Sequence, residues 1–154
     1  FMNIKAVIFD WGRALFDSEA KQELPESQEV LKYCRDKGYR LGLVSLVTKQ
    51  ANADLEERRI QIENSRLRKY FEIALVTDTD KDKLFEKILG EFFLKPEEIV
   101  VVDDRTIRGI RWGNKHGCMT IWLQKGKFAG EAPNEETGQP THVIHELREL
   151  LSIL

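Results

Sequence analysis

Three aspartates directly follow apolar runs of this 154-residue chain, and their type and position point to phosphate chemistry. Asp10 follows the run at 4–9, whereas Asp103 and Asp104 follow a β-branched run at 99–102. A carboxylate can attack phosphorus to form an aspartyl-phosphate, and carboxylates are ligands that Mg²⁺ takes from proteins. If the two runs are strands of one sheet, these acids predict a site for a divalent cation and a phosphate.

A hydroxyl and two ammonium groups accompany the acids. Ser45 ends an apolar run at 39–44, and Lys81 and Lys83 stand at the beginning of an amphipathic segment. A hydroxyl and a lysine can hold the phosphate oxygens that a metal leaves free. The sequence alone does not choose between the two lysines. An acid at one strand end is often only a solvated residue or a helix cap, but the ordered set indicates a site.

Five apolar runs alternate with helical patterns along the chain. The expected strands are 4–9, 39–44, 71–76, 99–102 and 118–123, and the expected helices fall near 25–37, 49–68, 84–93 and 106–116. This alternation predicts an α/β fold, a three-layer Rossmann-like domain with a central five-stranded parallel sheet. Ligands of such sheets bind beyond the carboxyl ends of the strands, where the candidate residues fall.

The length of the chain predicts a single domain over residues 1–154. The site-bearing core is expected at about 4–123, followed at 124–154 by a loop and a C-terminal helix. The apolar stripe of that helix is Val143, Ile144, Leu147, Leu150, Leu151 and Leu154. The gaps at 16–40 and 45–81 have no room for a separate cap domain.

Composition excludes several classes of function. The 24 basic and 26 acidic residues give a formal charge of −2, whereas proteins that bind nucleic acid usually have a basic excess. Cys34 and Cys118 lack the spacing of a zinc site or a disulfide scaffold, so we expect reduced, buried thiols. No apolar run approaches the length of about 18 residues that a membrane span needs. No signal peptide is visible, and a cytoplasmic location is expected.

The order of these residues resembles the haloacid dehalogenase superfamily of phosphohydrolases. The resemblance extends from about Ile4 to Leu123 and is most specific in VIFDWGRALFDSE, residues 7–19, and in KPEEIVVVDDR followed by IRWGNKHGCMTIWL, within residues 95–123. The segment LGLVS at 41–45 has the expected spacing between them.

The resemblance implies a role for each candidate. Asp10 matches the nucleophile, Ser45 the phosphate-binding hydroxyl, and Lys81 or Lys83 the lysine that neutralises the aspartyl-phosphate. The implied ligands of Mg²⁺ are Asp10, the carbonyl of Gly12, Asp104 and the adjacent Asp103.

The resemblance also implies a substrate and an assembly. The substrate would be a small phosphorylated compound or a phosphoprotein, and Trp11, Gly12 and Arg13 join Ser45 as candidates for binding it. Family members without a cap leave the site open or cover it by oligomerisation, so a homo-oligomer is one expectation.

Four positions depart from the commoner family pattern. Gly12 replaces the second Asp that serves as general acid and base, Arg13-Ala14 replaces Gly-Thr, and Gly109 stands where a further metal-binding acid often follows. Losing a general acid costs 10²–10⁴-fold in rate and matters least for acyl and aryl phosphates. We therefore expect a weak phosphatase or one biased to good leaving groups. Asp17 or Glu19 could replace the missing acid, although both fit ordinary surface positions.

Two other interpretations remain beside the phosphatase. A catalytically impaired relative would use the same fold to bind a ligand or a protein. A phosphoacceptor receiver domain fits less well, because that fold has its paired acids at the first strand.

The basic residues after Asp104 are interpreted as a solvated helix face, with steering of an anionic substrate as the alternative. They are Arg105, Arg108, Arg111 and Lys115.

Overall fold

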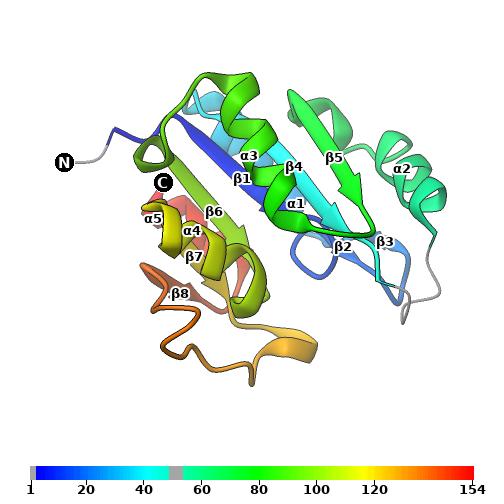
Figure 1. The fold of residues 1–154 in the computed structure, drawn as a ribbon. Helices are drawn as coiled ribbons and strands as arrows, with labels where there is room; N and C mark the ends of the chain where they lie inside the picture. The colour runs from blue at the N-terminus through cyan, green and yellow to red at the C-terminus, as the bar shows by residue number, and fades with distance from the viewer. Residues whose placement is uncertain (1–2, 49–53) are drawn as a thin grey trace.

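The computed structural model describes residues 3–48 and 54–154 and has a six-stranded sheet at its centre (Figure 1). Its strands are β1 (Ala6–Asp10), β4 (Arg40–Leu46), β5 (Ile73–Thr77), β6 (Ile99–Asp103), β7 (Met119–Leu123) and β8 (His142–Ile144). The order is β5-β4-β1-β6-β7-β8, and every neighbouring pair is parallel. From β1 the chain adds β4 and then β5 on one side, and it adds β6, β7 and β8 on the other side. The strand order therefore reverses at β1.

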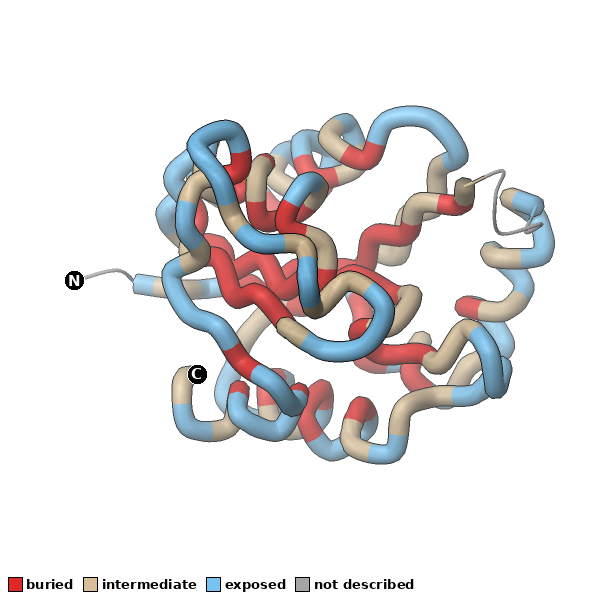
Figure 2. The backbone as a smooth tube through the Cα atoms, turned by 90° about the horizontal axis from the view of Figure 1, so that it is seen from below, coloured by how far each residue is buried: buried red, intermediate tan, exposed pale blue. Residues whose placement is uncertain are grey.

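Helices cover both faces of the sheet, which confirms the three-layer Rossmann-like class. The helices are α1 (Ser27–Asp36), α2 (Leu55–Glu63), α3 (Lys81–Phe92), α4 (Arg111–His116) and α5 (Leu150–Ile153). In Figure 1, α3 and α4 lie in front of the sheet and α1 and α5 behind it. Alternate residues of β1 enter the two resulting cores: Val7 and Phe9 face α1, whereas Ala6 and Ile8 face α3. Buried segments accordingly run through the middle of the molecule in Figure 2.

The helix ends agree with local sequence signals. Gly38 has a φ of 93° just beyond α1, and Gly117 has a φ of 88° at the end of α4. Asp54 begins α2 by accepting hydrogen bonds from two backbone N–H groups, so this helix is shorter than the one expected at 49–68. The part of that prediction at 49–53 lies outside the described residues. Phe93, the last residue of the helix expected at 84–93, is instead the left-handed residue just beyond α3, and it is 93% exposed.

The C-terminal region differs from the prediction. The stripe assigned to one last helix instead begins with a sixth strand, β8, which pairs with β7. A single 3₁₀ turn, η6 (Leu147–Glu149), follows and leads into the short α5. Val143 and Ile144 are β-branched, so their strand preference prevails over the leucine spacing that follows. The sheet therefore has six strands rather than five.

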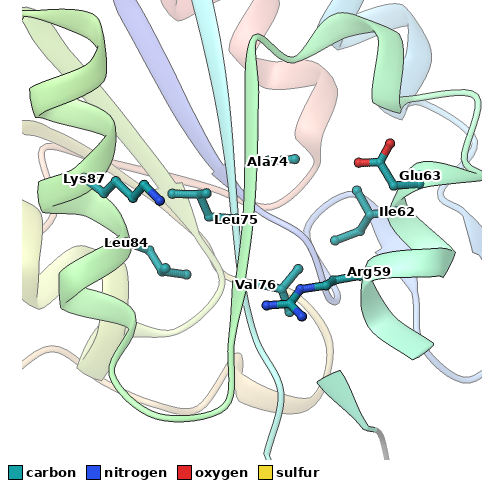
Figure 3. Close-up of a pocket in the computed structure, with 8 residues that line it drawn as sticks. All are labelled: Arg59, Ile62, Glu63, Ala74, Leu75, Val76, Leu84 and Lys87. Carbon is teal, nitrogen blue, oxygen red and sulfur yellow. The ribbon is translucent and has the colours of Figure 1, made fainter. Parts of the chain in front are cut away.

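Two further features border the sheet. A small antiparallel ribbon, β2 (Phe16–Asp17) and β3 (Gln22–Glu23), connects β1 to α1. A depression of about 310 Å³ lies at the β5 edge between α2 and α3 (Figure 3). It is lined by Arg59, Ile62, Glu63, Ala74, Leu75, Val76, Leu84 and Lys87. No helix among the described residues is long and apolar enough to cross a membrane.

Candidate active site

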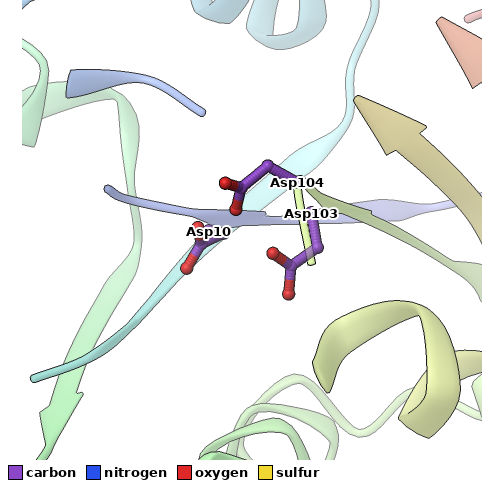
Figure 4. Close-up of side chains that lie close together, drawn as sticks. All are labelled: Asp10, Asp103 and Asp104. Carbon is purple, nitrogen blue, oxygen red and sulfur yellow. The ribbon is translucent and has the colours of Figure 1, made fainter. Parts of the chain in front are cut away.

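The sheet register brings the three aspartates together. Asp10 ends β1 and Asp103 ends β6, and these strands are neighbours in which Phe9 pairs with Val102. One ligand oxygen from each of Asp10, Asp103 and Asp104 lies within 4.8 Å of the others. Figure 4 shows the three carboxylates gathered at the ends of the two strands. All three residues are buried.

Lys81 links two of these acids. Its ammonium donates to Oδ1 of Asp10 at 2.7 Å and to Oδ2 of Asp103 at 2.9 Å, and the side chain is 4% exposed. Burial alone would lower the pKa of Lys81, but the charges of both acids outweigh burial and raise that pKa. Lys83 is exposed. The structure thus brings Lys81 to the acids and leaves Lys83 at the surface.

Asp103 accepts three hydrogen bonds. Besides Lys81, it accepts the backbone N–H of Arg105 at 3.0 Å and that of Gly109 at 2.8 Å. Burial acts to raise the pKa of Asp103, but Lys81 and these hydrogen bonds lower it below the ordinary value. Asp103 is therefore a charged carboxylate that holds Lys81 and the following turn.

Asp104 has the opposite environment. Its Oδ2 is buried and accepts no hydrogen bond from the described residues. Burial, followed by the charges of Asp10 and Asp103, raises the pKa of Asp104 to about 9. An unpartnered carboxylate oxygen beside two other acids fits a hard divalent cation, which would supply the missing opposite charge. The donor set on this chain therefore suits a metal of the Mg²⁺ type.

The turn after β6 explains how Gly109 is tolerated. Residues Thr106–Ile110 form a π-helical turn, η4, a distortion that is frequent at functional sites. A Cβ atom built on Gly109 would collide with the carboxylate of Asp103. The space that a side chain at position 109 would need is thus filled by Asp103. The sequence suggested that the site lacks one acid here, and the structure places the carboxylate of Asp103 in that space.

The segment after Asp10 contains three further candidates for binding substrate, Trp11, Gly12 and Arg13. Trp11 is fully buried, stacks on Phe16 with ring centroids 5.0 Å apart and donates from Nε1 to Gln61 at 2.8 Å. The prediction that its side chain contacts substrate is wrong for this structure, because the indole belongs to the core. Gly12 is half-buried, and Arg13 adopts a left-handed conformation with a φ of 63°.

Ser45 has a partner that the sequence did not reveal. Its hydroxyl, 1% exposed, accepts a hydrogen bond of 2.8 Å from Nη1 of Arg58 in α2. Burial and the charge of Arg13 lower the pKa of Arg58, whereas the charge of Asp10 acts to raise it. Ser45 and Arg58 thus approach Asp10 from the β4 side. No periodicity or motif singled out Arg58, because its position depends on how α2 packs against the sheet.

Asp17, considered as a replacement acid, has a local structural role. Its Oδ1 accepts the backbone N–H groups of Glu19 at 2.9 Å and Ala20 at 3.0 Å. The depression of Figure 3 is lined by none of the three clustered aspartates, so it is separate from the candidate site.

Comparisons with known proteins indicate what the chain is similar to. The sequence model of the HAD-hydrolase-like family matches residues 80–150. The glyceraldehyde 3-phosphate phosphatase of Pyrococcus furiosus is 30% identical over 139 residues, which are 86% of this chain and 55% of that protein. The chain is therefore similar to proteins of the haloacid dehalogenase superfamily. The glyceraldehyde 3-phosphate phosphatase of Methanopyrus kandleri is 27% identical over 137 residues, covering 84% of this chain and 55% of that protein.

Solved structures related to the haloacid dehalogenases share the fold. A HAD phosphatase from Thermococcus onnurineus superposes with a TM-score of 0.78 at 16% identity, covering 97% of each chain. The L-2-haloacid dehalogenase RSc1362 gives a TM-score of 0.77 at 16% identity over 98% of each chain. The chain spans about half the length of the curated phosphatases that it matches.

Proposed function

We propose that this chain is an Mg²⁺-dependent phosphatase that acts through an aspartyl-phosphate on Asp10. The observation that carries the proposal is the buried cluster in which Lys81 bridges Asp10 and Asp103 while an oxygen of Asp104 lacks a partner. The superfamily and the names of the curated relatives support it. We further propose that residues 1–154 act as one domain without a cap.

The first step would be attack by the Asp10 carboxylate on phosphorus. A bond forms between a carboxylate oxygen and phosphorus, the ester P–O bond breaks, and the leaving oxygen departs with the electron pair. Lys81 lies where it can neutralise charge on the phosphoryl oxygens, and the hydroxyl of Ser45 can donate to another of them. Mg²⁺ held by Asp10, Asp104 and the carbonyl of Gly12 would supply further positive charge to these oxygens.

The second step would release phosphate. A water molecule attacks phosphorus, the bond between phosphorus and the Asp10 oxygen breaks, and Asp10 is regenerated as a carboxylate while both protons of the water leave on the phosphate. Lys81 stays between Asp10 and Asp103 throughout and holds the nucleophile in place. Asp103 would fix Lys81 and the turn at Gly109 rather than attack.

The substrate preference follows from Gly12. With no carboxylic acid at this position, alkoxide leaving groups depart without a protein-supplied proton, whereas acyl and aryl groups need none. We infer a small phosphorylated substrate with a good leaving group, with a phosphoprotein as the larger alternative. Gly12 also favours a second candidate function, an impaired relative that binds phosphate ligands without turning them over.

The test compares the wild type with Asp10→Asn and Asp104→Asn, using acetyl phosphate and 4-nitrophenyl phosphate with and without Mg²⁺. Asp17→Asn is the matched control, because an amide oxygen can keep the turn that the Asp17 carboxylate holds. We expect Mg²⁺-dependent hydrolysis in the wild type and the control only. In thermal unfolding followed by calorimetry, we expect Mg²⁺ to raise the Tm of the wild type but not that of Asp104→Asn. Equal rates in all four proteins would contradict the phosphatase, and Mg²⁺ binding without hydrolysis would identify the binding module.

A further inference from the structure

Arg58 is in direct contact with a group of the candidate site. Its Nη1 donates a hydrogen bond of 2.8 Å to the hydroxyl of Ser45, which is buried. Ser45 directly follows Val44, and Val44 is the register partner of Asp10 in the neighbouring strand. Because neighbouring strands lie about 4.8 Å apart, this register holds the contact beside the candidate nucleophile. Arg58 therefore brings a positive charge to the β4 side of Asp10.

Arg58 and Lys81 come from helices on opposite faces of the sheet. Ile62 of α2 belongs to one hydrophobic core, whereas Phe85 of α3 belongs to the other. Lys81 begins α3 and binds Asp10 from that face. Arg58 lies near the beginning of α2 and reaches the end of β4 from the opposite face. A phosphoryl group at Asp10 would thus have a cation on each side of the sheet.

Most donors of Arg58 are free to bind an incoming group. A guanidinium has five N–H donors. Within residues 3–48 and 54–154, the hydrogen bond to Ser45 is the one that this guanidinium makes, and no carboxylate there forms an ion pair with it. The Ser45 hydroxyl is the acceptor of this bond, so its own hydrogen can be donated to another acceptor. Ser45 and Arg58 can therefore donate to the same anion.

The charges of the cluster indicate which anion this is. Lys81 and a divalent cation together carry three positive charges, which offset the carboxylates of Asp10, Asp103 and Asp104. A phosphoryl dianion bound to these groups brings two negative charges that they do not offset. Arg58 supplies a further positive charge at the hydroxyl that is the candidate for binding phosphate.

We propose that Arg58 is a further catalytic residue, which donates to an oxygen of the same phosphoryl group that Ser45 binds. Its planar donors match the oxygens of a phosphoryl group. Negative charge is spread over the equatorial oxygens in the transition state of phosphoryl transfer, so this contact would assist the reaction as well as binding. The inference rests on the proposed function, because it assumes that the phosphoryl group lies beside Asp10.

Titration calorimetry with inorganic phosphate in the presence of Mg²⁺ tests the contact without turnover. We expect Arg58→Gln to weaken phosphate binding by about tenfold or more and Arg58→Lys to keep part of the affinity. Arg59→Gln is the matched control, because Arg59 is exposed, pairs with Glu56 at 3.8 Å and lines the depression of Figure 3. It should bind phosphate as the wild type does. Urea unfolding shows that each variant is folded.

A double-mutant cycle separates direct binding from an effect through Ser45. If Arg58 binds the phosphoryl group, Arg58→Gln weakens phosphate binding in the Ser45→Ala protein as well. No further loss in that protein would mean that Arg58 only orients the hydroxyl and would overturn the inference. Unchanged affinity in Arg58→Gln, an equal loss in Arg59→Gln, or a wild type that does not bind phosphate would also overturn it.

Acetyl phosphate hydrolysis, measured in parallel, tests the proposed function separately. Phosphate binding that depends on Arg58, without Mg²⁺-dependent hydrolysis by the wild type, would support the role of Arg58 as a phosphate ligand and contradict the phosphatase. Hydrolysis that Arg58→Gln leaves at the wild-type rate, with phosphate affinity also unchanged, would support the phosphatase and contradict the role of Arg58.

Discussion

The ammonium of Lys81 lies 2.7 Å from the carboxylate of Asp10, although 71 positions separate the two residues in the chain. Asp10 ends the central strand β1, and Lys81 begins α3, which packs on one face of the sheet. The contact is buried, so it is screened little by salt. It joins the candidate nucleophile to the candidate charge-neutralising group without any substrate.

Replacing Lys81 separates its role from that of Lys83. Lys81→Met leaves Asp10 and Asp103 buried without their counter-charge, which should lower the free energy of unfolding by about 3–5 kcal/mol. Lys83→Met removes an exposed ammonium and should change it by no more than about 0.5 kcal/mol. Urea unfolding at neutral pH measures both. Similar losses in the two variants would contradict the assignment of Lys81.

Restoring an acid at position 12 tests the explanation of leaving-group preference. A Cβ atom on Gly12 has its nearest neighbour, Oγ of Ser18, at 3.4 Å, so a side chain fits. Gly12→Asp should raise kcat/KM for an alkyl phosphate such as glycerol 3-phosphate by about tenfold or more, because the new acid can protonate the alkoxide. The rate with 4-nitrophenyl phosphate should change much less. Gly12→Ala is the control, and a gain there of equal size would contradict proton transfer.

Gly109 offers a steric test of the site. Gly109→Ala forces the new methyl group against the Asp103 carboxylate and should cost about 1–3 kcal/mol of unfolding free energy. Gly90→Ala is the matched control, because it lies within α3 with no atom near the added Cβ. It should stabilise the protein by about 0.5–1 kcal/mol. Thermal and urea unfolding of both variants checks the opposite signs.

The two buried thiols predict how stability changes in alkali. Burial raises the pKa of Cys34 and Cys118 from 9.0 to about 12. Between these values the unfolded chain loses thiol protons that the folded chain keeps, so the free energy of unfolding falls as pH rises. The double variant Cys34→Ala, Cys118→Ala should show a shallower fall between about pH 8 and 10.5 in urea midpoints. Identical slopes would contradict protonated thiols in the folded state.

Much of the fold was predictable because strand and helix patterns are local. The β-branched run at 99–102 became β6, and the acid that follows it reached the site as expected. The C-terminal prediction failed because the leucine spacing suits a helix and obscured the strand preference of Val143 and Ile144. The pairing of β8 with β7 is a contact between distant segments that no local pattern contains.

One missed assignment had a signal in the sequence. Lys81, Phe85, Ile88 and Phe92 follow helical spacing and are the buried residues of α3, whereas Lys83 falls outside that spacing. The choice between the lysines could therefore have been made. The contact of Arg58 with Ser45 could not be predicted, because it depends on how α2 packs against the sheet.

The position of β1 has a consequence for resistance to thermal inactivation. All five of its residues are buried, and it is hydrogen-bonded on both sides, to β4 and to β6. Such a strand cannot open locally by itself, since its backbone amides reach water only when the neighbouring strands separate from it. The attacking carboxylate is thereby anchored to the most protected backbone of the molecule, and thermal inactivation would coincide with melting of the whole sheet.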